Sequence, residues 1–272
     1  MTKKGLLVIL CGPSQFGKDY IISQTSQILK KFDLETTQPT VYKIRKSRQN
    51  DPAYIKCVED EKDIPIKPED RLEYVIYGKQ KVVYSKSEIE SKLQQGKIMF
   101  VTVGDPDFAT ELKKQFYNNS VSVFVRGFAV GAEQMAKTEL TRKELKIADL
   151  DTTEGEEILF SMENRLEHIK SLKPQYEKFM QDKVNGADYV YTNYWTLFGG
   201  HWNTHFDEIE KSEEYDFIYL IEDIHQQLSK DDNAPWRIKF KRKLDGVVRD
   251  RNPYNLDVEW KEYLAQKDER TI

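Results

Sequence analysis

A short stretch near the start of the chain has the residue types and spacing of a phosphate-binding loop. Residues 12–19 fit the pattern G-x-x-x-x-G-K between an apolar run at 6–10 and an amphipathic segment at 20–29. Gly12 and Gly17 let the backbone curl until successive N–H groups point at one anion, and Lys18 adds a mobile cation. The stretch therefore predicts a P-loop made of Gly12, Pro13, Ser14, Gln15, Phe16, Gly17, Lys18 and Asp19.

The residue after Lys18 departs from the usual pattern. Ser or Thr normally stands there, because its hydroxyl binds Mg²⁺, whereas this chain has Asp19. A carboxylate oxygen also binds Mg²⁺, so Asp19 is a candidate metal ligand, but its negative charge lies close to the phosphates. Three interpretations stay open: a metal held differently, an unusual ligand, or a site that has lost catalysis. A ligand-free glycine turn is the fourth, and the flanking strand and helix argue against it.

Two further groups of charged residues follow predicted strands. Arg45 and Arg48 follow a short strand at 40–44, and two loop arginines at this spacing can grip one phosphate, although solvated surface charge is the alternative. Asp105 follows a longer strand at 97–103. A carboxylate at the carboxyl end of a parallel strand can hold metal-bound water or a substrate hydroxyl.

The segments around these residues alternate between strand and helix patterns. Further strands are predicted at 120–125 and 187–193, with a short strand at 54–58 and a hairpin from 71–78 and 81–84. Helices are predicted at 20–29, 87–93 (from a Ser87–Glu90 capping box), 108–116, 158–179 with a bend at Pro174, and 209–228. This alternation is typical of an α/β fold in which helices cover a mostly parallel sheet.

The composition limits the class of protein. The chain has 272 residues, a formal net charge of −4 and no apolar run of membrane-spanning length, which argues against nucleic-acid and membrane partners. Two cysteines, Cys11 and Cys57, fit a reduced, cytoplasmic chain, and we recognise no signal peptide. The four histidines have no clear metal-binding spacing. The oligomeric state stays open, with a homodimer as one option.

The ordered set of motifs resembles the guanylate kinase family of nucleoside monophosphate kinases, which have a P-loop kinase fold. The likeness covers residues 5–228 and rests on the strand and loop at 8–18, the arginine pair, and the segments 72–74, 84–85, 96–105, 164–166 and 187–193. Asp19 departs from the family pattern, and Gly104 rather than Asp105 aligns with the family's acidic residue if nothing is inserted there. Residues 229–272 have no counterpart that we recognise.

The resemblance implies an ATP-dependent kinase that uses Mg²⁺ and phosphorylates GMP, dGMP or a related or modified nucleotide. It implies a domain at 1–228, with an acceptor-binding insertion at about 45–95 and a lid at about 127–157, before a C-terminal extension at 229–272. ATP would contact the P-loop and Asn193, Asp19 would hold the metal, and Lys18, Arg142 and Arg165 would be catalytic. The implied acceptor-binding residues are Arg45, Arg48, Tyr54, Glu73 (at the guanine edge), Tyr84, Ser85 and Asp105.

Other interpretations of the same residues stay open. Asp19 is also compatible with a guanylate-kinase-like binding module that has lost turnover, and the fold is compatible with a sugar-phosphate kinase. The charged segment at 127–157 is either a lid or an exposed helical face. The basic segment at 236–243 is either an edge strand with a solvated face, which we favour, or a contact for an acidic partner.

Overall fold

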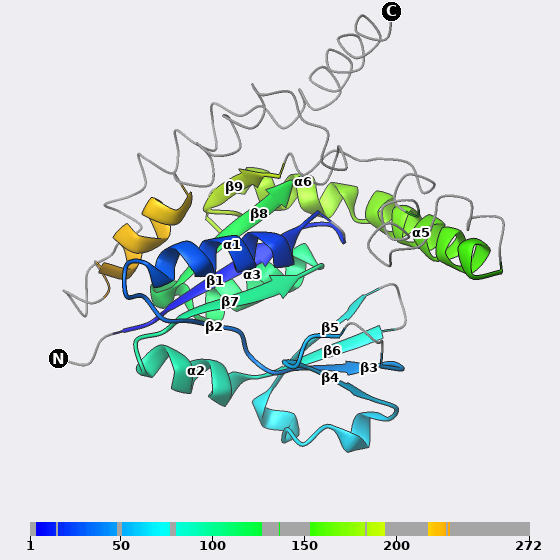
Figure 1. The fold of residues 1–272 in the computed structure, drawn as a ribbon, viewed down its shortest axis with the longest axis horizontal. Helices are drawn as coiled ribbons and strands as arrows, with labels where there is room; N and C mark the ends of the chain where they lie inside the picture. The colour runs from blue at the N-terminus through cyan, green and yellow to red at the C-terminus, as the bar shows by residue number, and fades with distance from the viewer. Residues whose placement is uncertain are drawn as a thin grey trace, which may run out of the picture.

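The computed structural model describes residues 4–14, 16–47, 51–76, 80–126, 136, 153–182, 184–193, 217–226 and 228. These residues form two sheets with helices packed on them (Figure 1). Of the predicted lid at about 127–157, Ala136 and residues 153–157 are described, and the rest lies outside the described residues. The extension at 229–272, Gln15, Arg48 and Arg142 also lie outside them. Within the described part of the chain, no helix has both the length and the apolar character needed to cross a membrane.

The larger sheet is entirely parallel and has five strands in the order β2-β7-β1-β8-β9. Every residue of β1 and β8 is buried, as expected for strands covered on both faces. The predicted α/β fold with a mostly parallel sheet is therefore confirmed. The strands are β2 (Thr36–Thr37), β7 (Ile98–Val103), β1 (Leu6–Cys11), β8 (Ser120–Arg126) and β9 (Tyr189–Thr192).

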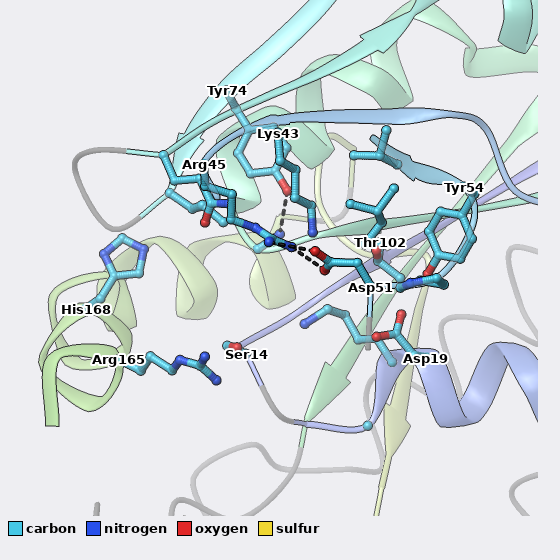
Figure 2. A pocket seen from close by; sticks show the side chains of 18 of the residues that line it. Ser14, Asp19, Lys43, Arg45, Asp51, Tyr54, Tyr74, Thr102, Arg165 and His168 are labelled. Carbon is cyan, nitrogen blue, oxygen red and sulfur yellow. Dashed lines mark hydrogen bonds and ion pairs between the residues drawn. The ribbon is translucent and has the colours of Figure 1, made fainter. Parts of the chain in front are cut away.

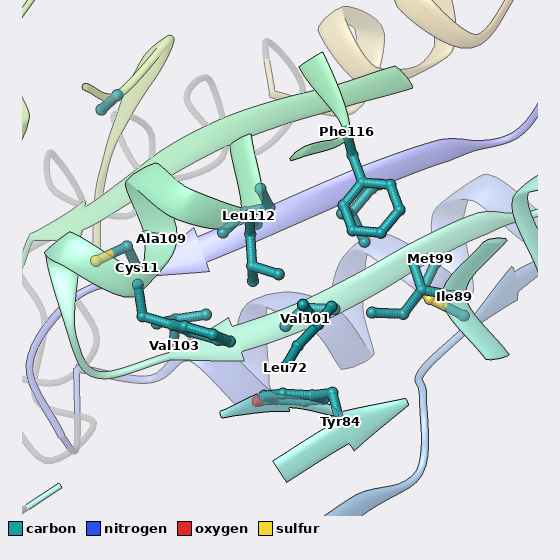
Figure 3. Packing of buried hydrophobic residues seen from close by; sticks show 14 of the residues in the cluster. Cys11, Leu72, Tyr84, Ile89, Met99, Val101, Val103, Ala109, Leu112 and Phe116 are labelled. Atoms are coloured by element: carbon teal, nitrogen blue, oxygen red, sulfur yellow. The ribbon is translucent and has the colours of Figure 1, made fainter. Parts of the chain in front are cut away.

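Helices cover both faces of this sheet. On one face, α1 (Lys18–Lys30) packs with the helical residues 217–226 against alternate residues of β1, including Leu6, Val8 and Leu10. The opposite residues of β1 pack against three other helices in a second apolar cluster, part of which is shown in Figure 3. These helices are α2 (Lys86–Gln94), α3 (Pro106–Gln115) and α6 (Lys173–Gln181).

The smaller sheet has four strands in the order β4-β3-β6-β5, of which β3 and β4 are parallel and the other pairs antiparallel. Leu72 and Tyr84 on one face join the second apolar cluster, so this sheet is fixed to the main core. The predicted hairpin is present, but its turn at 77–79 lies outside the described residues. The strands are β4 (Ile55–Val58), β3 (Val41–Ile44), β6 (Gln80–Ser85) and β5 (Arg71–Ile76). Short 3₁₀ turns occur at Glu61–Asp63, Pro68–Asp70 and Tyr117–Asn119.

Two helix predictions need correction. The capping residue of α2 is Ser85 rather than Ser87, because the Ser85 hydroxyl accepts the Glu88 N–H at 3.1 Å. The long helix predicted at 158–179 is two helices, α5 (Thr153–Ser171) and α6, separated at Leu172. Pro174 lies in the first turn of α6, where its missing N–H does no harm, so it starts a new helix instead of bending a continuous one.

Candidate active site

The loop between β1 and α1 has the backbone conformation that its glycines predict. Gly12 has φ +156°, and a Cβ added there would lie 2.3 Å from the carbonyl oxygen of Val125. Gly17 has φ 75° and is the N-cap residue just before α1. A side chain at either position would be strained, so the loop requires both glycines. The positive end of α1 therefore faces the space that the loop encloses.

The side chain of Lys18 folds back onto the backbone of this loop. Its ammonium donates hydrogen bonds to the carbonyl oxygens of Gly12 and Pro13, at 2.7 and 2.6 Å. Burial lowers the pKa of Lys18 from 10.5 to about 8, although the neighbouring Asp19 carboxylate acts in the opposite direction. A phosphate bound beside Lys18 would favour the charged form, because an anion stabilises an ammonium group.

A cavity of about 640 Å³ opens beside the loop, between the smaller sheet, α5 and α6 (Figure 2). Its volume is in the range of small-molecule sites. It brings together predicted site residues from distant parts of the sequence: Ser14, Gly17, Lys18, Asp19, Arg45, Tyr54, Tyr84 and Arg165. Arg165 reaches it from α5, on the side of the P-loop in Figure 2.

The sequence did not single out several residues that line the cavity, among them Val41, Lys43 and His168. Val41, Lys43 and Arg45 alternate along β3 and just beyond it, and all three line the cavity. Period-two spacing was the available signal for Lys43, because alternate residues of a strand share a face. His168 follows Arg165 by about one helical turn on α5. Burial lowers the pKa of His168, with Asp105 acting in the opposite direction, so the imidazole is neutral near pH 7.

Arg45 is already paired with a carboxylate inside the cavity. Its Nη1 donates to Asp51 Oδ2 at 2.8 Å, and its Nη2 makes a second, shorter contact with Oδ1. The hydrogen bond from Asp51 raises the pKa of Arg45, and the thiol of Cys57 also lies 3.3 Å from Asp51 Oδ2. Asp51 was not predicted as a site residue. Arg48, which the sequence pairs with Arg45, lies outside the described residues.

Tyrosines form another wall of the cavity. The Tyr84 hydroxyl donates to the carbonyl of Thr102 at 2.9 Å, and the Tyr176 hydroxyl donates to the carbonyl of Gly104 at 2.6 Å. Tyr74 stacks on Phe108, with ring centroids 4.6 Å apart. Burial raises the pKa of both Tyr74 and Tyr84, so these phenols stay protonated at neutral pH.

Among the described residues outside the P-loop, four that the resemblance implied do not line this cavity. Glu73 is exposed and pairs with Lys81 at 3.0 Å, on the face of β5 opposite the cavity-lining Tyr74. The other three have structural hydrogen bonds that join or cap elements. Ser85 caps α2, Asp105 caps α3 by accepting the N–H groups of Asp107 and Phe108 at 2.8 and 3.0 Å, and buried Asn193 donates to the Phe16 carbonyl at 3.0 Å.

The residues present fit a magnesium ion bound with a nucleotide. Asp19 is exposed in the first turn of α1 and lines the cavity beside Lys18. Among the described residues, no three His, Cys, Asp or Glu side chains gather into a metal cluster. Mg²⁺ does not need such a cluster, because it keeps several waters and takes one or two carboxylates together with substrate phosphates.

Known proteins similar in sequence include two guanylate kinases. The guanylate kinase of Aster yellows witches'-broom phytoplasma (strain AYWB) is 28% identical over 125 residues, which are 46% of this chain and 59% of that protein. The guanylate kinase of Onion yellows phytoplasma (strain OY-M) is 27% identical over 125 residues, which are 46% of this chain and 58% of that protein. The matches therefore span less than two thirds of these relatives. They confirm the resemblance to the guanylate kinase family that the motifs predicted.

No protein-family model matches the chain. The crystal structure of guanylate kinase from Anaplasma phagocytophilum aligns over 78% of this chain and 87% of its own, with 12% identity and a TM-score of 0.38.

Proposed function

We propose that the chain is an ATP-dependent nucleoside monophosphate kinase. An oxygen of the acceptor's phosphate would attack the γ-phosphorus of ATP, the bond from that phosphorus to the β-phosphate oxygen would break, and ADP would leave. The observation that carries this proposal is the cavity onto which Lys18, Arg45 and Arg165 converge from three separate elements. Its support in sequence is the similarity to two guanylate kinases.

Each part of the cavity has a role in the proposal. The P-loop N–H groups, the N-terminus of α1 and Lys18 would hold the phosphates of ATP. Arg45 would hold the acceptor phosphate, and Arg165 would neutralise charge on the group in transfer. Asp19 would hold Mg²⁺, which neutralises phosphate charge when bound. Arg48 and Arg142 keep their proposed roles in acceptor binding and catalysis.

Positioning and electrostatics would supply the rate in this site. The attacking atom is already a phosphate oxygen, so no side chain is needed as a general base. Fixing the donor and acceptor phosphates against one set of cations removes the entropy cost of bringing them together. A low-dielectric cavity strengthens the interaction of these cations with the transferring group.

The first test is ADP formation from ATP and Mg²⁺ with ribo- and deoxynucleoside monophosphates, including GMP and dGMP. Lys18→Ala should abolish turnover. Lys30→Ala is a matched control, since Lys30 is an exposed lysine in the last turn of the same helix. Turnover that survives Lys18→Ala, or no turnover with any acceptor, would contradict the proposal.

One observation favours a second candidate, a nucleotide-binding module without turnover. Two carboxylates, Asp19 and Asp51, line the cavity where phosphates would bind. Repulsion between a carboxylate and a phosphate costs on the order of a few kcal/mol at intermediate dielectric. Asp19→Ser separates the two candidates. The kinase proposal expects lower activity and a higher Mg²⁺ requirement from this change, whereas a gain of activity would mark Asp19 as a defect.

A further inference from the structure

One wall of the cavity is a face of the smaller sheet, formed by alternate residues of β3 and β4. Val41 on β3 and Ile55 on β4 are partners in the register, and both line the cavity. Lys43 is the next residue of β3 on this face, with Cys57 of β4 as its register partner, and it lines the cavity too. Because alternate residues of a strand share a face, the backbone of β3 directs Lys43 to the cavity side of the sheet.

We infer that Lys43 is a further phosphate-binding residue of this site, which holds the acceptor's phosphate together with Arg45 on the side that faces the P-loop. The inference rests on the proposed kinase function, because that function places the acceptor's phosphate at Arg45. Neither the P-loop pattern nor the predicted arginine pair includes Lys43. An ammonium group has three N–H donors, so Lys43 can bind a phosphate oxygen and keep another contact at the same time.

Asp51 shows that this wall of the cavity holds an anion. Its carboxylate oxygens accept from the two Nη atoms of Arg45, and the Cys57 thiol donates to its Oδ2 at 3.3 Å. Lys43 is the register partner of Cys57, so it lies on the same face as the group that contacts this carboxylate. Figure 2 shows Lys43 and Arg45 reaching into the cavity. A phosphate that displaces or joins the carboxylate at Arg45 would therefore lie on the face that Lys43 occupies.

The charge of Lys43 reaches both ends of the proposed reaction. At the P-loop, burial lowers the pKa of Lys18, and the charge of Lys43 acts in the same direction. At the acceptor end it acts on the Cys57 thiol. Burial and the hydrogen bond to Asp51 raise the pKa of this thiol, whereas the charges of Arg45 and Lys43 oppose the rise. An acceptor phosphate within reach of Lys43 is thus also directed toward the P-loop, where the ATP phosphates would lie.

The cavity carries more positive than negative charge. Among the described residues that line it, four side chains are lysine or arginine and two are carboxylates. Like charges in one partly buried space repel each other, because water screens them less there than at the surface. A phosphate monoester carries close to two negative charges near pH 7 and would relieve this repulsion. The cations are Lys18, Lys43, Arg45 and Arg165, and the carboxylates are Asp19 and Asp51.

The neighbouring strand supplies a matched control. Lys56 on β4 is exposed and does not line the cavity, whereas Ile55 beside it does. Lys56→Met therefore removes one positive charge from the same sheet, but on the opposite face. Lys43→Met removes the ammonium group and keeps an unbranched side chain of similar length. Lys43→Arg keeps a cation at the position and tests whether the charge is what matters.

Steady-state kinetics with ATP and whichever monophosphate the wild type phosphorylates tests the inference. Lys43→Met should raise the acceptor KM by roughly tenfold to a hundredfold, which is the scale of a hydrogen bond to a charged group. The KM for ATP should change much less. Lys43→Arg should recover most of the loss, and Lys56→Met should match the wild type. An unchanged acceptor KM in Lys43→Met, or a larger rise in the KM for ATP, would overturn the inference and leave the kinase proposal standing.

Calorimetry separates the inference from the kinase proposal, because it needs no turnover. GMP, dGMP, AMP, CMP, UMP and dTMP are titrated into the wild type and the three variants, with ADP as the probe of the P-loop end. If Lys43→Met weakens the monophosphates that bind by roughly tenfold or more and spares ADP, the inference holds even where no acceptor is phosphorylated. Equal weakening of ADP, or no weakening, overturns it. If none of these monophosphates binds the wild type, the role of Lys43 is wrong along with the acceptor site.

Discussion

Inside the cavity, the guanidinium of Arg45 and the carboxylate of Asp51 face each other, and the two Nη atoms contact the two carboxylate oxygens. Both side chains are largely buried, at 13% and 12% exposed. A partly buried pair of this geometry is stronger than a surface ion pair, because water screens it less. An acceptor phosphate that uses Arg45 must therefore displace Asp51 or share the guanidinium with it.

Asp51→Asn should tighten acceptor binding, because it removes the internal competitor for Arg45. We expect the acceptor KM to fall by roughly threefold to tenfold, as one charge-assisted hydrogen bond is lost, with the KM for ATP unchanged. Steady-state kinetics with each substrate varied in turn measures this. Asp63→Asn is a control at an exposed carboxylate. A higher acceptor KM would mean that Asp51 orients Arg45 rather than competing with phosphate.

The binding of ATP should weaken as the pH rises above about 8. The pKa of Lys18 is lowered to about 8 by burial, so the ligand-free protein loses this cation in that range. Calorimetry between pH 7 and pH 10 should show the affinity falling for the wild type. Lys18→Arg stays charged throughout and should show a much flatter profile. Parallel profiles for the two proteins would contradict the role of Lys18.

The lowered pKa of Lys18 also predicts how pH affects the free energy of unfolding. Between about 8 and 10.5 the unfolded chain keeps the Lys18 proton that the native chain has lost. The free energy of unfolding of the wild type, relative to Lys18→Met, should therefore rise with pH across this window and stay level below it. Urea denaturation at a series of pH values measures the difference.

Glu73→Ala should leave the choice of acceptor unchanged, because Glu73 faces away from the cavity and pairs with Lys81. Ratios of kcat/KM between acceptors should stay within about twofold, and the loss of a surface ion pair should cost under about 1 kcal/mol. Tyr74→Phe, one residue along the same strand, should alter those ratios, since Tyr74 lines the cavity. If Glu73→Ala lost the discrimination between acceptors and Tyr74→Phe kept it, the placement of Glu73 outside the cavity would be wrong.

Lys113→Met should destabilise the fold without touching the site. The Lys113 ammonium, 2% exposed, contacts Asp188 at 2.9 Å and the Gly186 carbonyl at 2.6 Å. Leaving Asp188 buried without this cation should lower the free energy of unfolding by about 3–5 kcal/mol. Lys114→Met, at an exposed neighbouring position, is the control for chemical denaturation. A change under about 1 kcal/mol would show that Asp188 is satisfied by its other contacts.

The parallel sheet and the P-loop could be predicted because their signals are local. Continuous apolar runs mark β1, β7 and β8, and the glycine spacing marks the loop. The break at Leu172 could not be placed from the sequence, because Pro174 is compatible with either a bent helix or the first turn of a new one.

The wall of the cavity formed by the smaller sheet was harder to predict for two reasons. In a strand, moving by one residue changes the face, so the sequence could mark β5 without specifying that Tyr74, and not Glu73, lines the cavity. The pairing of Arg45 with Asp51 depends on how the chain turns between β3 and β4, which no residue pattern specifies. The contact between Tyr176 and Gly104 joins residues 72 apart in the sequence.

The separation of α5 from α6 places Arg165 and Tyr176 on two different helices. Tyr176 fastens α6 to the end of β7 through the Gly104 carbonyl, and Pro174 lies in the first turn of the same helix. Arg165 lies on α5 about 10 Å of helix from the break at Leu172. The cavity therefore takes its Arg165 cation and its Tyr176 hydroxyl from two helices rather than from one.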